Sequence, residues 1–260
     1  MRVDLTDRVT IVTGAGRGIG RAIAEAAAES GSKVVLAARS AEQIEGVAQA
    51  LRERGLKALA VPTNLVEPEA AKQLVQKTVE SFGKVDILVN NAATNLVANL
   101  VMMKEEQLRE VYELNVFATF RLTKEVMRGM IKHKWGRVIN VSSISAKTGA
   151  AYNSAYASSK AAMLGFTRSV AKETAQLGIT VNAICPWHVD TELLRGAMSK
   201  RGALFGKTAE EYLAEIADTS PQKRILDVSE VAAQALYLMS PEAKGVTGQS
   251  LNICGGMLMD

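Results

Sequence analysis

Short runs rich in valine and isoleucine alternate along the chain with longer amphipathic segments, and this alternation restricts the fold more than any other feature of the sequence. The runs lack a clear two-residue alternation, which is typical of strands buried on both faces of a sheet. The segments between them have the period of a helix, so the pattern predicts parallel strands joined by helices. The expected strands cover residues 9–12, 33–37, 58–61, 85–89, 136–141, 180–184 and 250–253.

The whole pattern predicts one doubly wound α/β domain over residues 1–260, with a seven-stranded parallel sheet flanked by helices. No linker, internal repeat or low-complexity segment divides the chain. Residues 191–221 form the one irregular zone, and their mixture of serine, lysine, arginine and glycine predicts a mobile substrate lid. The expected helices cover residues 18–29, 41–54, 68–82, 104–133, 155–176 and 228–239.

Composition excludes several classes of protein. Apolar residues make up 48% of the chain and charged residues 22%, a balance of globular domains and not of disordered, collagen-like or coiled-coil chains. No apolar run approaches the roughly 20 residues that span a bilayer, and the first residues contain no apolar signal region. With only Cys185 and Cys254, no disulfide framework is expected, so we predict a cytoplasmic protein. The net charge of +4 is scattered and only 5% of residues are aromatic, which argues against a nucleic-acid partner.

A glycine-rich turn, Thr13-Gly-Ala-Gly-Arg-Gly-Ile-Gly20, follows the first expected strand and opens a helix. It has the form T-G-x-x-x-G-x-G, carried by Gly14, Gly18 and Gly20. Glycines there let a pyrophosphate approach the backbone, and the helix N-terminus supplies free N–H groups. Tight turns use glycine for their own geometry as well, but the strand–turn–helix context favours a dinucleotide site and a Rossmann fold.

The end of the second expected strand predicts which dinucleotide binds. An acidic residue there would accept the ribose 2′-hydroxyl of NAD, but this chain has Arg39 and no acid. A guanidinium pairs bidentately with a phosphate, and Arg17 in the glycine turn is placed to approach the same group. Two solvated arginines are the alternative interpretation. The missing acid favours NADP(H) over NAD(H).

Four polar residues farther along are the candidate catalytic residues. Ser143 ends the fifth expected strand, and Asn115 lies within the long helix before it. Tyr156 and Lys160 lie four residues apart on one face of a helix. Reduction of a carbonyl produces an alkoxide, and a tyrosine with an ordinary pKa of about 10 is a useful acid and base only if its phenolate is stabilised. The Lys160 ammonium and oxidised nicotinamide would stabilise it, while Ser143 would hold the carbonyl oxygen.

Together these residues give the chain a resemblance to the short-chain dehydrogenase/reductase family over essentially its full length. The pattern resembles NADP(H)-dependent carbonyl reductases and 3-oxoacyl-carrier-protein reductases. The matching motifs are residues 13–20, Asn90-Asn-Ala92, Asn115, Ser143, Tyr156 with Lys160, and Pro186 to Thr191.

The resemblance implies a role for each matching residue. Tyr156 would be the general acid and base, with Lys160 lowering its pKa and holding the nicotinamide ribose. Asn115 would anchor a water-linked proton relay. Homotetramers are usual in such proteins. The implied cofactor contacts are Gly14, Arg17, Gly18, Ile19, Gly20, Arg39, Ser40, Asn64, Leu65, Asn91, Ala92, Tyr156, Lys160, Pro186, Val189 and Thr191.

Three places depart from the family pattern. Asn64 stands where the family often has aspartate, and its amide oxygen can accept the same hydrogen bond from adenine. Ala93 replaces a frequent glycine. Pro186 is followed by Trp187 and His188 instead of glycine, which puts a bulky residue beside the nicotinamide pocket. We predict that His188 is a wall residue, with a substrate contact as the alternative.

Three functions fit these residues. The first is NADPH-dependent reduction of a small or cyclic ketone. The second is reduction of a 3-oxoacyl group on an acyl carrier protein, in which Arg128 and Lys172 would dock the acidic carrier; ordinary helix-surface charge is the alternative interpretation of both. The third is a non-catalytic NADP-binding sensor or scaffold, which the intact catalytic set argues against. A small carbonyl or alcohol substrate is the expected partner.

Overall fold

One sheet of seven parallel strands runs through the molecule in the order β3-β2-β1-β4-β5-β6-β7. The computed structural model describes residues 3–259 and confirms the predicted Rossmann architecture, with each strand end within two residues of its expected position. The strands are β1 (Val9–Thr13), β2 (Lys33–Ala38), β3 (Ala58–Pro62), β4 (Ile87–Asn90), β5 (Gly136–Val141), β6 (Ile179–Pro186) and β7 (Ser250–Ile253).

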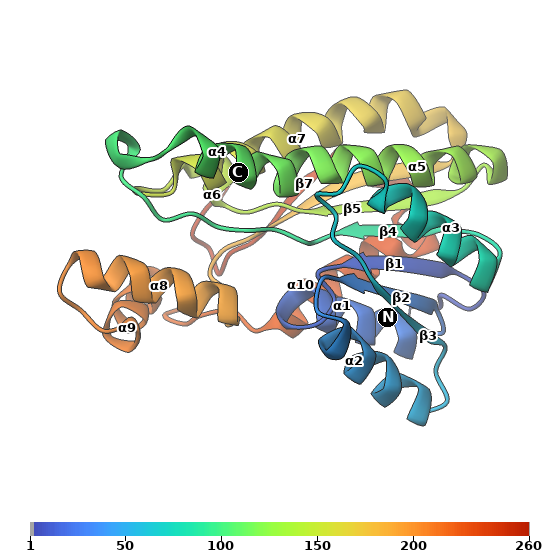
Figure 1. The fold of residues 1–260 in the computed structure, drawn as a ribbon, viewed down its shortest axis with the longest axis horizontal. Coiled ribbons are helices and arrows are strands. Elements are labelled where there is room, and N and C mark those ends of the chain that lie inside the picture. Colours follow the sequence, from blue (N-terminus) through green and yellow to red (C-terminus); the bar gives the residue numbers. More distant parts are fainter. Residues whose placement is uncertain (1–2, 260) are drawn as a thin grey trace.

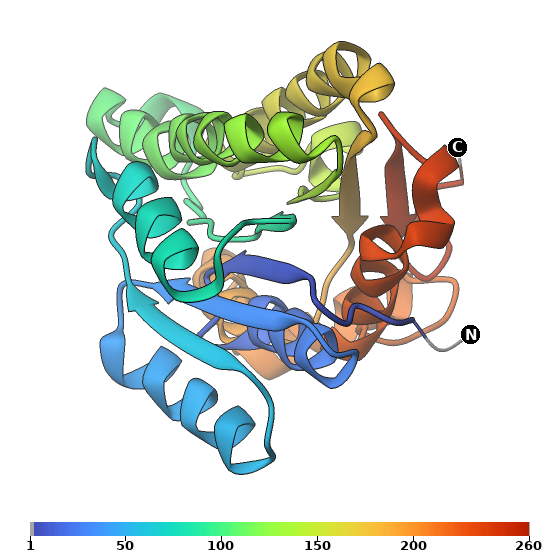
Figure 2. The ribbon, with the colours of Figure 1, turned by 90° about the vertical axis from the view of Figure 1, so that its right-hand side faces the viewer.

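Helices cover both faces of this sheet, as Figures 1 and 2 show. Helices α1, α2 and α10 pack on one face, and α3, α5 and α7 pack on the other. The helices are α1 (Gly18–Glu29), α2 (Ala41–Glu53), α3 (Ala70–Phe82), α4 (Glu105–Tyr112), α5 (Ala118–His133), α6 (Ser145–Thr148), α7 (Ser154–Thr174), α8 (Glu192–Leu204), α9 (Ala209–Thr219) and α10 (Val228–Met239). No helix within residues 3–259 is long and apolar enough to cross a membrane.

The two helical layers explain why the strands are apolar at consecutive positions. Successive side chains of a strand point to opposite faces, so each strand contributes to both cores. Val12 and Val89 pack in the core beneath α1, α2 and α10, whereas their chain neighbours Ile11 and Leu88 pack beneath α3, α5 and α7. All four side chains are fully buried. Strands such as β1 and β4 end in polar residues, Thr13 and Asn90, and a site can form there.

The strand order places that site. The chain crosses from β3 over the sheet to β4, so the connections after β1 and β4 diverge to opposite sides. Ligands of such sheets bind in the crevice outside the carboxyl ends of the strands at this switch point. Thr13 ends β1 and Asn90 ends β4, directly at that crevice.

The segment 104–133 is not the single helix that its period predicts. Helix α4 ends at Tyr112, a π-helical turn follows over Glu113–Phe117, and α5 continues to His133. The wider turn is seen in the hydrogen bond from the Ala118 N–H to the Glu113 carbonyl. Such turns often mark functional positions in helices, and this one contains Asn115.

The segment 191–221 is also more regular than predicted. It forms two helices, α8 and α9, which pack against each other at one end of the molecule (Figure 1). The Thr191 hydroxyl accepts a hydrogen bond from the Leu194 N–H, and Thr208 caps α9 together with Glu211. The serine, lysine and glycine content of this segment does not predict helices. The capping residues Thr191 and Thr208 are the start signals that indicate them.

Candidate active site

The glycine turn has the geometry that a pyrophosphate requires. Gly14 and Gly18 have φ angles of 65° and 55°, in the left-handed region that favours glycine. Gly20 has no room for a side chain, because a Cβ atom there would lie 2.3 Å from the Gly14 carbonyl oxygen. The turn therefore brings backbone alone to the N-terminus of α1, where free N–H groups face the crevice.

Thr13 fastens this turn to the neighbouring strand. Its hydroxyl accepts hydrogen bonds from the N–H groups of Asn91 (2.9 Å) and Ala92 (3.0 Å) and donates to the Val89 carbonyl at 3.2 Å. The Asn91 side chain donates back to the Thr13 carbonyl at 2.9 Å. We predicted Asn91 and Ala92 as cofactor contacts, whereas the fastening role of Thr13 was missed. The signal in the sequence is the threonine that begins the T-G-x-x-x-G-x-G motif.

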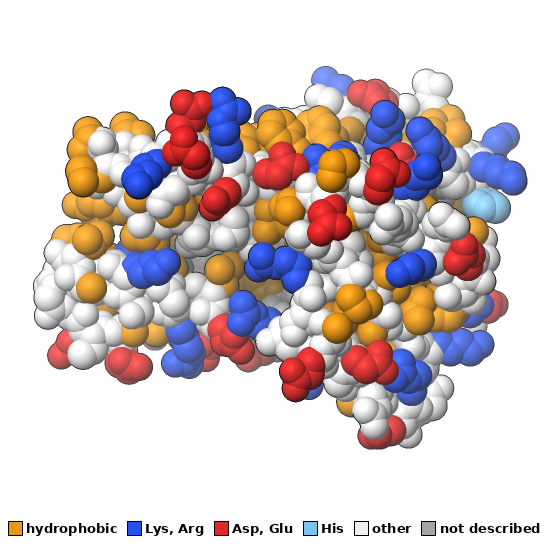
Figure 3. All heavy atoms as spheres, viewed as in Figure 1, with side chains coloured by type: hydrophobic (Ala, Val, Ile, Leu, Met, Phe, Trp, Pro, Cys, Tyr) orange, Lys and Arg blue, Asp and Glu red, His pale blue; other side chains and the backbone are white. Residues whose placement is uncertain are grey.

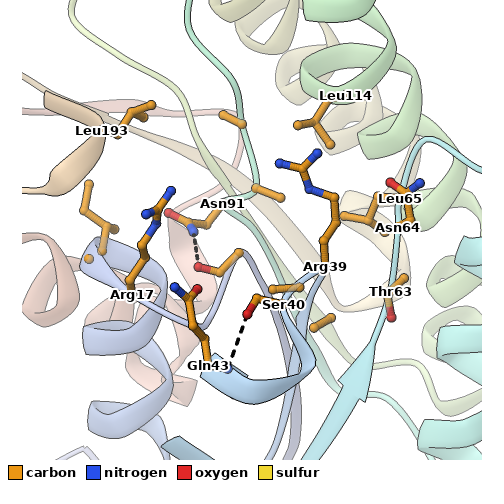
Figure 4. Close-up of a pocket in the computed structure, with 18 of the residues that line it drawn as sticks. Arg17, Arg39, Ser40, Gln43, Thr63, Asn64, Leu65, Asn91, Leu114 and Leu193 are labelled. Carbon is orange, nitrogen blue, oxygen red and sulfur yellow. Dashed lines mark hydrogen bonds between the residues drawn. The ribbon is translucent and has the colours of Figure 1, made fainter. Parts of the chain in front are cut away.

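A cavity of about 410 Å³ opens beside the turn, over the ends of β2 and β3. Figure 3 shows a hollow in this face with basic side chains near its rim. In Figure 4 the Arg39 side chain extends from the end of β2 toward Leu114, and Ser40 caps α2 by accepting from the Gln43 N–H. Within residues 3–259 no group bonds the exposed Arg39 guanidinium. Arg39 is thus an uncompensated cation in the cavity.

Arg17 differs from the expectation for it. It lines the same cavity, but its guanidinium forms an ion pair with Glu192, at the start of α8. Both side chains are more than half exposed, so the pair contributes little to stability. Arg17 is therefore not a second free cation beside Arg39.

A second cavity, of about 310 Å³, contains the candidate catalytic residues Ser143, Tyr156 and Lys160. It shares five lining residues with the first cavity, so the two form one continuous cleft from Arg39 to Tyr156. The shared residues are Ile19, Asn91, Ala93, Thr191 and Leu193.

Ser143, Tyr156 and Lys160 lie together in this cavity. The Ser143 hydroxyl accepts a hydrogen bond from the Ser145 N–H at 3.1 Å and donates toward the Tyr156 phenol. The Lys160 ammonium lies 5.7 Å from the centre of the Tyr156 ring and donates to the Val141 carbonyl at 2.7 Å. A hydroxyl, a phenol and an ammonium are thereby held at the carboxyl end of β5.

Burial changes the pKa of both ionisable groups. It raises the pKa of Tyr156 to about 12, with the Ser143 hydrogen bond acting in the opposite direction. It lowers the pKa of Lys160 to about 8. The lowered tyrosine pKa that the family resemblance implies is therefore not present in the protein alone, because desolvation of the phenolate outweighs its stabilisation.

Buried amides fix the helix that carries Tyr156 and Lys160. The Asn90 side chain donates to Asn140 at 2.9 Å and to Thr123 at 3.1 Å, and Asn140 donates to Thr167 of α7 at 2.9 Å. This network joins β4 and β5 to both α5 and α7. A fully satisfied buried network specifies one arrangement, so α7 has a defined position over the strand ends.

Asn115 is close to the site but faces elsewhere. Its amide accepts from the Thr94 N–H at 2.8 Å, and donates to the Thr94 carbonyl and to the Ser159 hydroxyl, each at 3.0 Å. It thus ties the loop after β4 to α7, beside Lys160. Its part in a proton relay stays a prediction.

The other predicted residues divide between the two halves of the cleft. Gly20 lies in the turn itself, and Ala92 lines the first cavity. Trp187 and His188 line the second, where their rings lie 4.7 Å apart. Burial lowers the pKa of His188 to about 4, so the imidazole is neutral. Six further lining residues were not singled out, because the sequence offers no local motif for them, although four of them lie in the predicted lid 191–221: Asn95, Asn153, Leu194, Ala197, Met198 and Arg201.

Comparison with known proteins gives a consistent result. A family model described as short chain dehydrogenase matches residues 8–202. The 3-oxoacyl-[acyl-carrier-protein] reductase FabG of Vibrio cholerae is 39% identical over 257 residues, which cover 99% of this chain and 100% of that protein.

Two solved structures have the same fold. A tryptophan variant of actinorhodin polyketide ketoreductase with NADPH superposes with a TM-score of 0.93 at 35% identity, covering 96% of this chain and 97% of that chain. The L-sorbose reductase of Gluconobacter frateurii, complexed with NADPH and L-sorbose, has a TM-score of 0.93 at 32% identity, covering 100% of each chain. Because the family model matches three quarters of its residues, this chain belongs to the short-chain dehydrogenase family of NAD(P)-dependent oxidoreductases.

Proposed function

We propose that the protein is an NADP(H)-dependent carbonyl reductase, which transfers hydride between NADP(H) and a ketone or secondary alcohol. The observation that carries the proposal is the continuous cleft from the glycine turn and Arg39 to Ser143, Tyr156 and Lys160. Two relatives of the same fold were solved with NADPH, which supports the choice of cofactor.

The residues present fit a phosphorylated dinucleotide. Gly18 has a φ of 55°, which favours glycine, and a Cβ atom there would lie 3.1 Å from the Thr191 side chain, so glycine keeps this part of the turn open. Arg39 would hold the 2′-phosphate without a competing protein carboxylate. Asn64 and Leu65 would flank the adenine, and the nicotinamide half would lie toward Lys160, Pro186, Val189 and Thr191. When bound, the cofactor supplies the hydride and, once oxidised, a positive charge.

Ser143 and Tyr156 would act on the carbonyl oxygen. In the free protein the Ser143 hydroxyl accepts from the Ser145 N–H and donates toward the Tyr156 phenol, and it would donate to the carbonyl oxygen of a bound substrate instead. Tyr156, with a pKa of about 12, is protonated at neutral pH and donates its proton as the alkoxide forms. The Lys160 ammonium would then stabilise the phenolate. Homotetramer formation and a cytoplasmic location remain predictions from the family resemblance and the composition.

Removal of the phenol tests this mechanism. Tyr156→Phe is expected to lower kcat by about 10²- to 10⁴-fold, because it removes the general acid, and to leave NADPH affinity unchanged. Oxidation of NADPH with a panel of ketones gives kcat, and NADPH fluorescence gives affinity. Tyr237→Phe, on α10, is the matched control. A Tyr156→Phe enzyme with more than about a tenth of the wild-type kcat would disprove the role, and an inactive wild type that binds NADPH would favour a sensor.

A second candidate is reduction of a 3-oxoacyl group on acyl carrier protein, favoured by the 39% identity to FabG over the whole chain. Arg128 on α5 and Lys172 on α7 are both exposed, and Arg128 pairs with Glu125 at 3.2 Å. Acetoacetyl-carrier protein and acetoacetyl-pantetheine distinguish the candidates. A higher kcat/KM for acetoacetyl-carrier protein than for acetoacetyl-pantetheine, lost in Arg128→Glu, would establish the carrier-protein function. Equal kcat/KM values for the two substrates would favour a small free ketone as substrate.

A further inference from the structure

The catalytic half of the cleft has an unusual balance of charge. Its lining residues include no aspartate or glutamate, within residues 3–259, but two cationic side chains, Lys160 and Arg201. Lys160 belongs to the proposed catalytic set. Arg201 lies in α8 and has no place in that mechanism. Its position in the wall therefore needs a separate explanation.

Arg201 lacks the partners that buried cations normally have. One guanidinium nitrogen donates to the Ala151 carbonyl at 3.3 Å, while Nε is buried and has no hydrogen-bond partner. No carboxylate in residues 3–259 pairs with it. Burial lowers its pKa from the ordinary arginine value. A half-buried guanidinium without an anion is unfavourable in the free protein, so the site is poised to bind one.

Arg195, on the same helix, provides the contrast. Its guanidinium holds Asp190 through two hydrogen bonds of 2.9 Å, and it lies outside the catalytic cavity. The two arginines lie on the same helix and differ in their partners: Arg195 pairs with a carboxylate, and Arg201 does not. The one that faces the cavity is the one without a carboxylate.

The rest of the cavity wall is also suited to a polar ligand. The side chains of Asn95 and Asn153 are among its lining residues, beside the hydroxyls of Ser143 and Tyr156. No lining residue within residues 3–259 is acidic, so nothing in the wall repels an anion at Arg201. An aliphatic acyl chain offers neither an anion nor a donor.

We propose that the substrate is an oxo acid, whose carboxylate binds Arg201 while its ketone lies at Ser143 and Tyr156. The inference rests on the proposed carbonyl reductase function and specifies its substrate class. A charge-assisted hydrogen bond from the guanidinium to the carboxylate fixes orientation as well as affinity, so Arg201 acts as the specificity residue. His188, neutral beside it, forms the neighbouring wall.

Acid and ester pairs test this assignment. We expect acetoacetate or levulinate to be reduced with a higher kcat/KM than its methyl ester. Arg201→Met should lower kcat/KM for the acid by about 10- to 100-fold, mainly through KM, and leave the ester within about twofold, since one charge-assisted bond is lost. Arg201→Lys should retain part of the preference, and Arg195→Met, which removes the same charge from the same helix, should retain all of it.

Binding without turnover separates this proposal from the proposed function. In the Tyr156→Phe protein with NADPH, butyrate should quench or enhance cofactor fluorescence at lower concentration than butyramide, and Arg201→Met should abolish the difference. If no ketone is reduced but this difference is found, the function fails and the anion site stands. Equal loss for acids and esters, at an unchanged Tm, would overturn the proposal in favour of a structural bond from Arg201 to Ala151.

The anion could come from another source, and a further pair identifies it. A preference for acetoacetyl-phosphopantetheine over acetoacetyl-pantetheine that depends on Arg201 would replace the carboxylate by a phosphate and overturn the oxo-acid assignment. We expect no such preference, because Arg201 lies in the wall of the same cavity as Tyr156. No difference between any acid and its ester in the wild type would also overturn the assignment.

Discussion

Burial shifts the pKa values of Tyr156 and Lys160 in opposite directions. The phenol holds its proton more firmly than in water, and the ammonium holds its proton less firmly. Both shifts follow from one cause, since a buried site disfavours the charged form of either group. The Tyr156 phenol is therefore protonated, and able to act as an acid, before substrate binds. Its conversion to phenolate requires positive charge, which Lys160 and an oxidised nicotinamide would bring.

Arg39 should determine the choice of cofactor. A charge-assisted bond to a 2′-phosphate is worth about 1.5–3 kcal/mol, so we expect NADPH to bind about 10- to 100-fold more tightly than NADH. The double change Ala38→Asp with Arg39→Leu should reverse the preference, because the new carboxylate accepts from a 2′-hydroxyl and repels a phosphate. Titrations of both cofactors at low and high salt measure it.

A matched control is Arg54→Leu, on an arginine that pairs with Glu29 away from the cleft. It should leave the cofactor ratio unchanged. Equal affinity of the wild type for the two cofactors, or tighter binding of NADH, would contradict the assignment of Arg39.

His188 should make the protein sensitive to acid. The pKa of His188 is about 4 in the folded protein, below the ordinary value of about 6.5. Between these two pH values the imidazole is protonated in the unfolded chain and neutral in the folded protein. Its contribution to stability is complete above pH 6.5 and is lost as the pH falls toward 4, by up to about 3 kcal/mol. Urea unfolding at several pH values measures the slope, which should be smaller in His188→Gln. The control His133→Gln changes the exposed end of α5, and equal slopes in wild type and His188→Gln would refute the shift.

At the scale of elements, the sequence predicts those features that depend on local pattern. Strand positions and the ends of α1 and α10 follow from apolar runs, glycine and capping residues, and they are found where expected. The π turn at Asn115 was not predictable from local pattern, and the bonds of the Asn115 side chain reach Thr94 and Ser159, 21 and 44 residues away. The same limit applies to Arg201, whose environment is set by α8 packing near Ala151 and not by its neighbours in sequence.

The glycine turn provides a prediction about an element. In Gly20→Ala the new methyl would lie 2.3 Å from the Gly14 carbonyl oxygen, so the turn must open. We expect a loss of about 1–3 kcal/mol in the free energy of unfolding and weaker NADPH binding, measured by urea unfolding and fluorescence titration. Gly46→Ala is the control: nothing lies within 4 Å of its Cβ position in α2, and it should stabilise by about 0.5–1 kcal/mol. Unchanged stability in Gly20→Ala would contradict the close packing.

At the scale of the whole molecule, the cleft is assembled from both halves of the chain. The first half contributes the glycine turn and the ends of β1 to β4, and the second half contributes α7 and α8. The ion pair of Arg17 with Glu192 joins segments 175 residues apart. A ligand in the cleft therefore contacts segments that are brought together only by folding.

Cofactor should accordingly stabilise the entire fold. NADPH at about 100 times its Kd should add about 2.7 kcal/mol to the free energy of unfolding, which raises the Tm by roughly 5–10 °C. A thermal scan with and without NADPH measures the change, and NADH at the same concentration should shift the Tm less. An absence of any shift at saturating NADPH would contradict a dinucleotide site in the cleft.

The two tryptophans lie at opposite ends of the strands, and this gives the protein an intrinsic fluorescence probe of the cleft. Trp187 follows the carboxyl end of β6, in the cavity wall, whereas Trp135 precedes the amino end of β5, where the guanidinium groups of Arg8 and Arg137 contact its ring. The six residues of β5 separate the two ends of the strand by about 20 Å. In Trp135→Phe, all indole emission would therefore arise beside the nicotinamide half, so resonance energy transfer to the reduced ring would report its arrival without any added dye.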